Sequence, residues 1–329
     1  MFLKGSNVTF MFIMFFSTIM VISSSSWLNA WISLEVNMMS IIPILINKQT
    51  FEATSSSIKY FLVQAMASMF LIVMMLIMYN SSAINMMNIN NEIILMGLAM
   101  KSGIPPFHFW LPQVIESMEV TQMFIVLSWQ KIAPFSLMSY SLSMVILAVI
   151  SSSAAVGAVG GYNQNSIKKI LVYSSMTHGA WMMTAMLMKS GLWMIYFAIY
   201  NLSLYIMCLI MDKMNIKNIS ETSNSFMPIK NKMILMSNML SMSGLPPFLG
   251  FAAKFLVIKM SVIYSMLVMV SILLMMSFLS VFYYLKICFS SFMLNEKQIF
   301  KMSKKSNSSM LLYMITISNM IIPTMVYLV

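Results

Sequence analysis

The stretches KSGIPPFHFWLP (Lys101–Pro112) and SGLPPFLGFAAKF (Ser243–Phe255) decide the fold of this chain. Each places Ser-Gly-x-Pro-Pro-Phe inside a long apolar segment, beside a lysine at membrane depth. A Pro-Pro pair removes two backbone donors and clashes with the preceding turn, so each helix must open there. An opened helix survives in hydrocarbon only where protein or water satisfies its carbonyl groups. Two matched breaks are typical of a transporter built from repeats, with an ion path near the midplane.

The composition shows that lipid is the solvent for most of the chain. Of 329 residues, 60% are hydrophobic and 8% are charged, and the mean hydropathy is +0.86. This balance excludes a soluble globular protein. All 19 basic residues are lysine and the methionines number 44, which suggests an A/T-rich mitochondrial genome. The net charge of +11 lacks the exposed basic and aromatic surface of a nucleic-acid-binding protein, so we expect no nucleic-acid partner.

The few potential metal ligands do not predict a cofactor. Two cysteines, Cys208 and Cys288, cannot hold an iron–sulfur cluster, which takes four ligands. The two histidines, His108 and His178, are far apart in the sequence and belong to no third-ligand pattern. We therefore expect no metal and no other cofactor on this chain.

The hydrophobic pattern predicts an all-α polytopic membrane protein with about eleven transmembrane helices, since a crossing needs about 20 apolar residues. We predict one membrane domain over residues 1–329 with two inverted repeats, about 27–140 and 143–290, each containing a discontinuous helix. Helices 7–25 and 310–328 are lateral or terminal. The predicted spans are 7–25, 27–46, 54–78, 93–117, 121–140, 143–161, 166–187, 192–213, 232–258, 262–290 and 310–328.

The lysines between the spans predict the orientation. With eleven spans, thirteen of the 19 lysines fall on the N-terminal side and two on the other, while four sit within spans. Positive loops stay on the side of synthesis. We therefore expect the N-terminus in the mitochondrial matrix and the C-terminus in the intermembrane space.

Four ionisable residues fall deep in the predicted spans: Glu35, Lys101, Lys131 and Lys254. Glu35 lies eight residues past Trp27, which is about 12 Å along a helix and near mid-membrane. Each such charge costs at least about 2.5–3.5 kcal/mol on insertion scales. Burial disfavours the charged form of lysine, so a buried lysine can pass a proton on, whereas an arginine stays protonated. The four residues favour a proton relay; static ion pairs that hold helices together are the alternative.

The two histidines permit a structural or a proton-carrying role. His108 follows the first break in PFHFW, and His178 sits in YSSMTHGAW beside several hydroxyl side chains. A buried histidine is commonly a hydrogen-bonded packing residue, but these positions also suit a proton shuttle. We include both among the candidate proton-transfer residues.

Six blocks occur in order between about residue 20 and residue 290: WLNAWISLEVNMMSIIPIL, EATSSSIKYFLVQAMAS, KSGIPPFHFWLP, SWQKIAPFSLMS, GGYNQNSIKKILVYSSMTHGAWM and SMSGLPPFLGFAAKFLVI. Together they resemble the NADH–ubiquinone oxidoreductase chain 2 family of animal mitochondria. That family comprises antiporter-like membrane-arm subunits of respiratory complex I. Any one block is a weak signal, but six in sequence are specific.

The resemblance implies a role for each buried charge. Glu35 looks like the glutamate that pairs with a lysine in the first half-channel, and Lys101 looks like that lysine, on the first broken helix. Lys131 resembles the connecting lysine of a hydrated central axis. Lys254 resembles the lysine of the second broken helix, which faces the exit half.

Other positions match the family less uniformly. His108 and His178 correspond to family histidines near the same axis. Pro105 stands where animal relatives usually have alanine, and Lys168 stands where they usually have arginine. Neither departure touches the implied relay.

The resemblance implies a core membrane-arm subunit of the respiratory chain that translocates protons as part of NADH:ubiquinone reductase. NADH oxidation and ubiquinone reduction are then expected elsewhere in the complex, with no redox chemistry on this chain. The implied partners are other membrane-arm subunits and the lipids of the mitochondrial inner membrane. Two alternatives stay open: a subunit of a cation/proton antiporter or membrane hydrogenase, and a non-conducting structural subunit.

Overall fold

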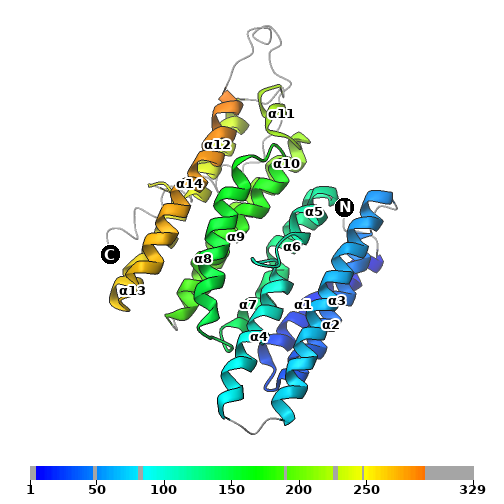
Figure 1. Ribbon diagram of the computed structural model, residues 1–329. Coiled ribbons are helices and arrows are strands. Elements are labelled where there is room, and N and C mark those ends of the chain that lie inside the picture. Colours follow the sequence, from blue (N-terminus) through cyan, green and yellow to red (C-terminus); the bar gives the residue numbers. More distant parts are fainter. Residues whose placement is uncertain are drawn as a thin grey trace. The chain divides into compact units, whose positions relative to one another are not determined.

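A computed structural model describes residues 5–46, 50–80, 84–188, 191–224, 229–246 and 248–292. Every named element within these ranges is an α-helix, as the sequence predicted. The predicted span over residues 310–328 lies outside them. The helices are α1 (Gly5–Ser23), α2 (Trp27–Leu45), α3 (Phe51–Asn80), α4 (Ile84–Ser102), α5 (Trp110–Ser117), α6 (Val120–Leu127), α7 (Trp129–Met138), α8 (Val145–Tyr162), α9 (Ile167–Leu187), α10 (Leu192–Met214), α11 (Ile219–Asn224), α12 (Ile229–Ser243), α13 (Leu249–Ile263) and α14 (Leu267–Phe292) (Figure 1).

The lengths and apolar character of the helices make this an all-α membrane protein. Five of the described helices are long and apolar enough to cross a bilayer by themselves: Trp27–Leu45, Phe51–Ile77, Val145–Tyr162, Leu192–Met214 and Leu267–Ser291. The predicted spans 93–117, 121–140 and 232–258 each consist of two shorter helices on either side of a break. The count of eleven crossings therefore stays a prediction.

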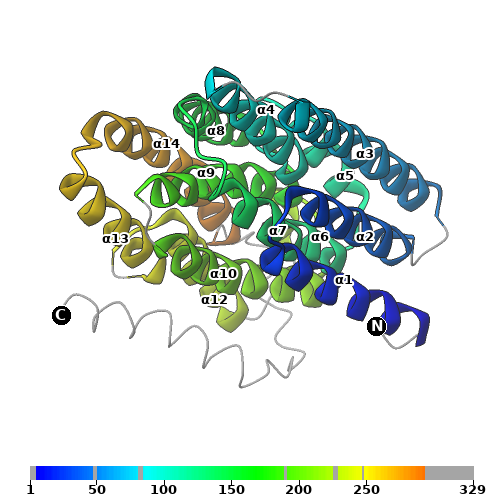
Figure 2. The same ribbon diagram turned by 90° about the horizontal axis from the view of Figure 1, so that it is seen from below.

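The chain divides into two compact units, Met1–Ser152 and Ser153–Val329, with the boundary inside α8. In the first unit, α2 packs between α1 and α3, and α3 also packs on α4 (Figure 2). In the second unit, α10 packs against α9, α12 and α13, while α14 packs against α9, α11 and α12. The repeat boundaries near residues 140–143 and the inverted relation of the repeats stay predictions.

The predicted span 121–140 contains a break that we did not predict from the sequence. Helix α6 ends at Leu127 and α7 begins at Trp129, because Ser128 adopts φ −106° and ψ −77°. The Ser128 hydroxyl donates back to the Phe124 carbonyl. Serine bonds of this kind bend helices. The break places Lys131 in the first turn of α7.

Gln122 joins the ends of two helices in the first unit. Its side chain accepts from the Glu119 N–H at 3.1 Å, which completes a capping box at the start of α6. Its amide also donates to the carbonyls of Ile44 and Leu45, at 2.9 and 3.1 Å, where α2 ends. One buried side chain thus satisfies orphan groups at two helix termini.

Three helix ends meet in the second unit. The Ile167 N–H at the start of α9 donates to the Lys217 carbonyl, just past the end of α10, at 3.0 Å. The hydroxyls of Thr222 in α11 and Ser290 near the end of α14 lie 2.8 Å apart. The start of α9 and the ends of α10 and α14 are therefore at one end of this unit.

Candidate functional site

Two backbone hydrogen bonds cap the end of α4, the first half of the first broken helix. Gly103 adopts φ +70°, and its N–H donates to the Met100 carbonyl at 3.2 Å. The next residue, Ile104, donates to the Ala99 carbonyl at 3.0 Å. These bonds form a Schellman motif, the common way in which a glycine ends an α-helix. The Pro-Pro pair that follows prevents the helix from continuing.

The second broken helix ends in the same way. Gly244 adopts φ +78° and donates to the Ser241 carbonyl at 3.1 Å. Leu245 donates to the Leu240 carbonyl at 3.3 Å. The shared Ser-Gly-x-Pro-Pro-Phe sequence therefore specifies the same helix end in both units.

Side chains from other elements supply further donors to the carbonyls of the first break. The Trp110 indole N–H donates to the Met100 carbonyl at 3.2 Å. The amide of Gln64, in α3, donates to the carbonyl of Lys101 at 3.1 Å. Open carbonyls inside a membrane need such partners, and here neutral donors supply them.

A small polar cavity of about 20 Å³ lies beside Lys101, large enough for one water molecule. Its lining includes Asn37 of α2, Gln64 of α3 and Gln130 of α7. Asn37 and Gln130 exchange two hydrogen bonds, each of 3.1 Å. Gln130 is the residue next to Lys131, so the amide cluster connects the first broken helix with α7.

Glu35 and Lys101 interact through space without direct contact. The Glu35 carboxylate exerts an electrostatic effect on the buried Lys101 ammonium. No salt bridge joins them in the part of the chain that the structure describes, where Glu35 Oε1 is buried without a hydrogen-bond partner. The Lys101 ammonium likewise makes no hydrogen bond to any described residue. Charges in this condition require water or a change of protonation.

Lys131 is among the most deeply buried side chains of the first unit. It is 2% exposed and follows the Ser128 break directly. The backbone N–H of Lys131 donates to the Ser128 carbonyl at 3.2 Å. This bond spans three residues, so the first turn of α7 is tighter than an α-helical turn. The sequence predicted a buried lysine here, and the structure adds a helix break beside it.

Lys254 has a different environment from Lys101. Its ammonium donates to the Ser243 carbonyl, at the last residue of α12, over 2.7 Å. A cation at a helix C-terminus is electrostatically favourable. Lys254 therefore bridges the two halves of its own broken helix.

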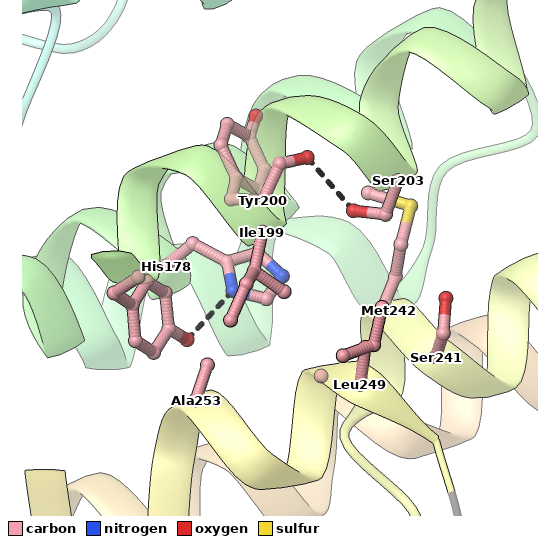
Figure 3. A pocket seen from close by; sticks show the side chains of 10 residues that line it. His178, Ile199, Tyr200, Ser203, Ser241, Met242, Leu249 and Ala253 are labelled. Carbon is pink, nitrogen blue, oxygen red and sulfur yellow. Dashed lines mark hydrogen bonds between the residues drawn. The ribbon is translucent and has the colours of Figure 1, made fainter. Parts of the chain in front are cut away.

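The two histidines occupy different places. His108 lies in the turn of the first break, with Nδ1 3.3 Å from the Pro106 carbonyl oxygen. His178 lies in α9, with Nδ1 2.8 Å from the Tyr196 hydroxyl of α10. A cavity of about 10 Å³, at the lower limit for one water, adjoins His178, Tyr200 and Ser203 (Figure 3).

This second cavity also meets the broken helix of its own unit. Ser241 and Met242 of α12 line it on one side, and Leu249 and Ala253 of α13 line it on another (Figure 3). Each unit thus brings a broken helix to a small cavity, which Lys101 itself lines in the first unit, while Lys254 follows the lining residue Ala253 in the second. Within the described residues, no three His, Cys, Asp or Glu side chains are arranged to hold a metal ion.

The predicted site residues fall into two groups. The first unit contains Glu35, Lys101, Lys131 and His108, and the second contains His178 and Lys254. Sequence reasoning missed the amides of Asn37, Gln64 and Gln130 and the phenols near His178. Amide side chains within apolar spans were the available signal, because an unpaired amide in hydrocarbon is costly.

The family described as "NADH:quinone oxidoreductase/Mrp antiporter, TM" matches residues 24–280. NADH-ubiquinone oxidoreductase chain 2 of Anopheles gambiae is 36% identical, with 99% of each chain covered. The protein of that name from Aedes aegypti is 37% identical, again over 99% of each chain.

A solved structure supports the fold independently. A chain of respiratory complex I from Thermus thermophilus with bound aureothin superimposes with a TM-score of 0.83 at 18% identity. The alignment covers 96% of the present chain and 76% of that chain. The chain belongs to the NADH:quinone oxidoreductase/Mrp antiporter membrane family and, within it, to the NADH-ubiquinone oxidoreductase chain 2 family.

Proposed function

We propose that this chain is a membrane-arm subunit of NADH:ubiquinone oxidoreductase and that it translocates protons. Its relatives of known name support the assembly, since they match along nearly the whole chain. The observation that carries the proton function is the pair of broken helices, each with a buried lysine and each lining a small cavity. NADH and ubiquinone react elsewhere in the complex, and this chain carries no cofactor.

The proposed relay uses changes in charge rather than bulk movement of the helices. In the first unit, Glu35 influences Lys101, and the amide cluster continues from Lys101 toward Lys131. Protonation of one group changes the proton affinity of its neighbours, so the groups titrate together. The same coupling lets a change elsewhere in the complex alter the proton affinity of these groups, because the linkage between two binding sites is reciprocal.

The second half of the relay comprises His178 and Lys254. His178 contacts the cavity that adjoins the broken helix, and its imidazole can give and accept protons through its two nitrogens. When Lys254 gives up a proton, its bond to the Ser243 carbonyl changes from a charge-assisted bond to a weaker neutral one. His108, at the turn of the first break, serves as a further shuttle.

The proposed location is the mitochondrial inner membrane, with the N-terminus in the matrix and the C-terminus in the intermembrane space. The lysine distribution supports this orientation. Neighbouring membrane-arm subunits and lipids cover the apolar outer faces, of which the exposed side chains of Phe12, Phe70 and Met275 are examples.

Replacing Lys131 with Met in the intact complex tests the relay. We expect NADH:ubiquinone turnover coupled to proton export to fall about tenfold, equivalent to about 1.4 kcal/mol in the barrier. Lys286→Met is the matched control, because Lys286 is an exposed lysine on α14. An unchanged ratio of protons exported per NADH, at unchanged turnover, in Lys131→Met would contradict the relay.

A structural role is the second candidate function, and the bond from Lys254 to the Ser243 carbonyl favours it at that position. A dry, permanently bonded set of charges would hold helices together without conduction. A high-resolution map of the intact complex decides between the two, since the relay requires water at Lys101 and Lys131. Cation-coupled transport without NADH oxidation would instead identify an antiporter.

A further inference from the structure

Three phenol oxygens of the second unit are buried and make no hydrogen bond of 3.5 Å or less to any residue that the structure describes. They belong to Tyr200 of α10 and to Tyr283 and Tyr284 of α14, whose side chains are 2%, 1% and 1% exposed. We call these three residues the phenol cluster. Burying a hydroxyl without a partner costs roughly 1–3 kcal/mol in proteins. Three such groups together indicate a site that takes hydrogen-bonding guests, and water is the smallest.

The phenol cluster lies among other hydroxyl groups. The hydroxyl of Thr177, in α9, is beside the Tyr283 phenol, and that of Ser174 is beside the Tyr284 phenol. Both α9 hydroxyls already donate to backbone carbonyls of their own helix, at 2.8 Å. Their lone pairs remain available to accept from water, because a hydroxyl has two.

A row of side chains on α10 extends the cluster in both directions. Tyr196, Tyr200, Cys208 and Asp212 are spaced by multiples of four residues, so they form a row that winds around the helix, because each step of four residues turns about 40° past a full turn. Tyr196 contacts His178 at one end of the row, through the 2.8 Å hydrogen bond. Asp212 is exposed at the other end. The thiol of Cys208 is near enough to both Tyr200 and Asp212 to interact with them electrostatically.

The row has one apolar member, Leu204. The ends of α10 and α14 meet at the same side of the unit, through the contacts of α11 described above. Tyr284 is six residues before Ser290, or about 9 Å deep at about 1.5 Å per residue. Leu204 is eight residues before Asp212, or about 12 Å deep. The Tyr283 and Tyr284 phenols therefore lie roughly at the depth of Leu204, where the row itself has no polar member.

We propose that the phenol cluster binds ordered water and carries protons between the Asp212 end of α10 and His178. Each hydroxyl accepts a proton on one lone pair and releases its own to the next water, so no phenol needs to lose its proton permanently. The inference rests on the proposed proton-translocating function and adds the uptake route for the second unit. In the proposed orientation, Asp212 lies on the lysine-rich matrix side.

The double substitution Tyr283→Phe/Tyr284→Phe in the intact complex tests this route. It removes two hydroxyls and keeps both rings, which pack 4.6 Å apart. We expect coupled turnover to fall about tenfold and the ratio of rates in H₂O and D₂O to rise, because proton uptake becomes rate-limiting. The matched control is Tyr264→Phe, whose half-exposed ring lies at the end of α13.

The isotope ratio separates conduction from packing. A substitution that only disturbs packing lowers the amount of assembled complex and leaves the H₂O/D₂O ratio of the remaining activity unchanged. Unchanged turnover, or a fall with an unchanged ratio, would overturn the proposed route. A high-resolution map of the complex in which the three phenols bond only to protein groups, with no water beside them, would also overturn it.

The phenol route and the relay through Lys131 can be tested independently of each other. Lys131→Met reports on the first unit, where none of the three phenols lies. If Lys131→Met abolishes proton export while the double tyrosine variant retains it with a normal isotope ratio, the relay stands and the phenol route is wrong. If both variants pump normally, the proposed function itself is wrong.

Discussion

The two broken helices share one backbone motif but satisfy their open carbonyls differently. At the first break, a neutral amide from α3, Gln64, takes the carbonyl of Lys101. At the second break, the ammonium of Lys254 takes the carbonyl of Ser243. The same six-residue sequence pattern thus supports two arrangements of the adjacent lysine.

This difference assigns the two lysines different tasks. Because Gln64 bonds the helix end, the Lys101 ammonium faces the polar cavity and the field of Glu35. The Lys254 ammonium donates one of its three protons to the Ser243 carbonyl, and this hydrogen bond is charge-assisted. Such bonds are stronger than neutral ones. The bond therefore favours the charged form of Lys254, whereas the Lys101 ammonium has no such bond to a described residue.

The largest expected effect concerns Gly250, which has no counterpart at the first break. A Cβ added there would lie 1.7 Å from the Ser241 carbonyl oxygen, so α13 packs directly on the backbone of α12. The corresponding residue after the first break is Phe109, which is 72% exposed. We expect Gly250→Ala to destabilise the protein by more than about 3 kcal/mol, the upper range for overpacking.

Thermal unfolding of the purified complex and the yield of assembled complex measure this effect. The control is Gly191→Ala, where an added Cβ meets nothing within 4 Å. Equal stability of the two variants would show that α12 and α13 do not pack this closely.

A smaller effect separates the two lysines. Lys254→Met leaves the Ser243 carbonyl without its charged donor, and we expect a loss of about 1.5–3 kcal/mol of stability. Lys101→Met removes no hydrogen bond to a described residue, so stability should change little while coupled turnover falls. Comparing the midpoint of thermal unfolding with turnover for both variants checks this. Equal loss of stability in the two would remove the distinction between the breaks.

The smallest effect is expected at Gln64. Gln64→Leu leaves the Lys101 carbonyl without its donor, which costs about 1–3 kcal/mol unless another donor takes over. Water in the adjacent polar cavity can donate instead, so we expect the loss to stay near about 1 kcal/mol. Coupled turnover should also fall, because Gln64 lines the cavity beside Lys101. A variant with full turnover would show that the relay does not need the Gln64 amide.

The sequence predicted the parts of this site that depend on covalent geometry. Proline and glycine act through their own backbone limits, so the breaks after Ser102 and Ser243 could be predicted without knowledge of packing. The depth of Lys131 followed from its central place in an apolar span. These features depend on residues that are close together in the sequence, so the local sequence pattern is enough to predict them.

The missed features depend on contacts between distant segments. Gln130 gives no local sign that it bonds Asn37, which is 93 residues away. The break at Ser128 contains neither proline nor glycine, and serine occurs in many unbroken spans of this chain. The bond from Lys254 to Ser243 depends on how α13 turns back on α12. Only the tertiary structure brings these partners together.

The double role of Gln122 has a consequence for biosynthesis. Its amide seals the end of α2 by bonding carbonyls up to 78 residues earlier in the chain. A ribosome that makes the chain from its N-terminus adds α3, α4 and α5 before this glutamine exists. The nascent end of α2 must meanwhile keep its carbonyls hydrated at the membrane surface, so the first unit reaches its final dry packing only after α6 has emerged.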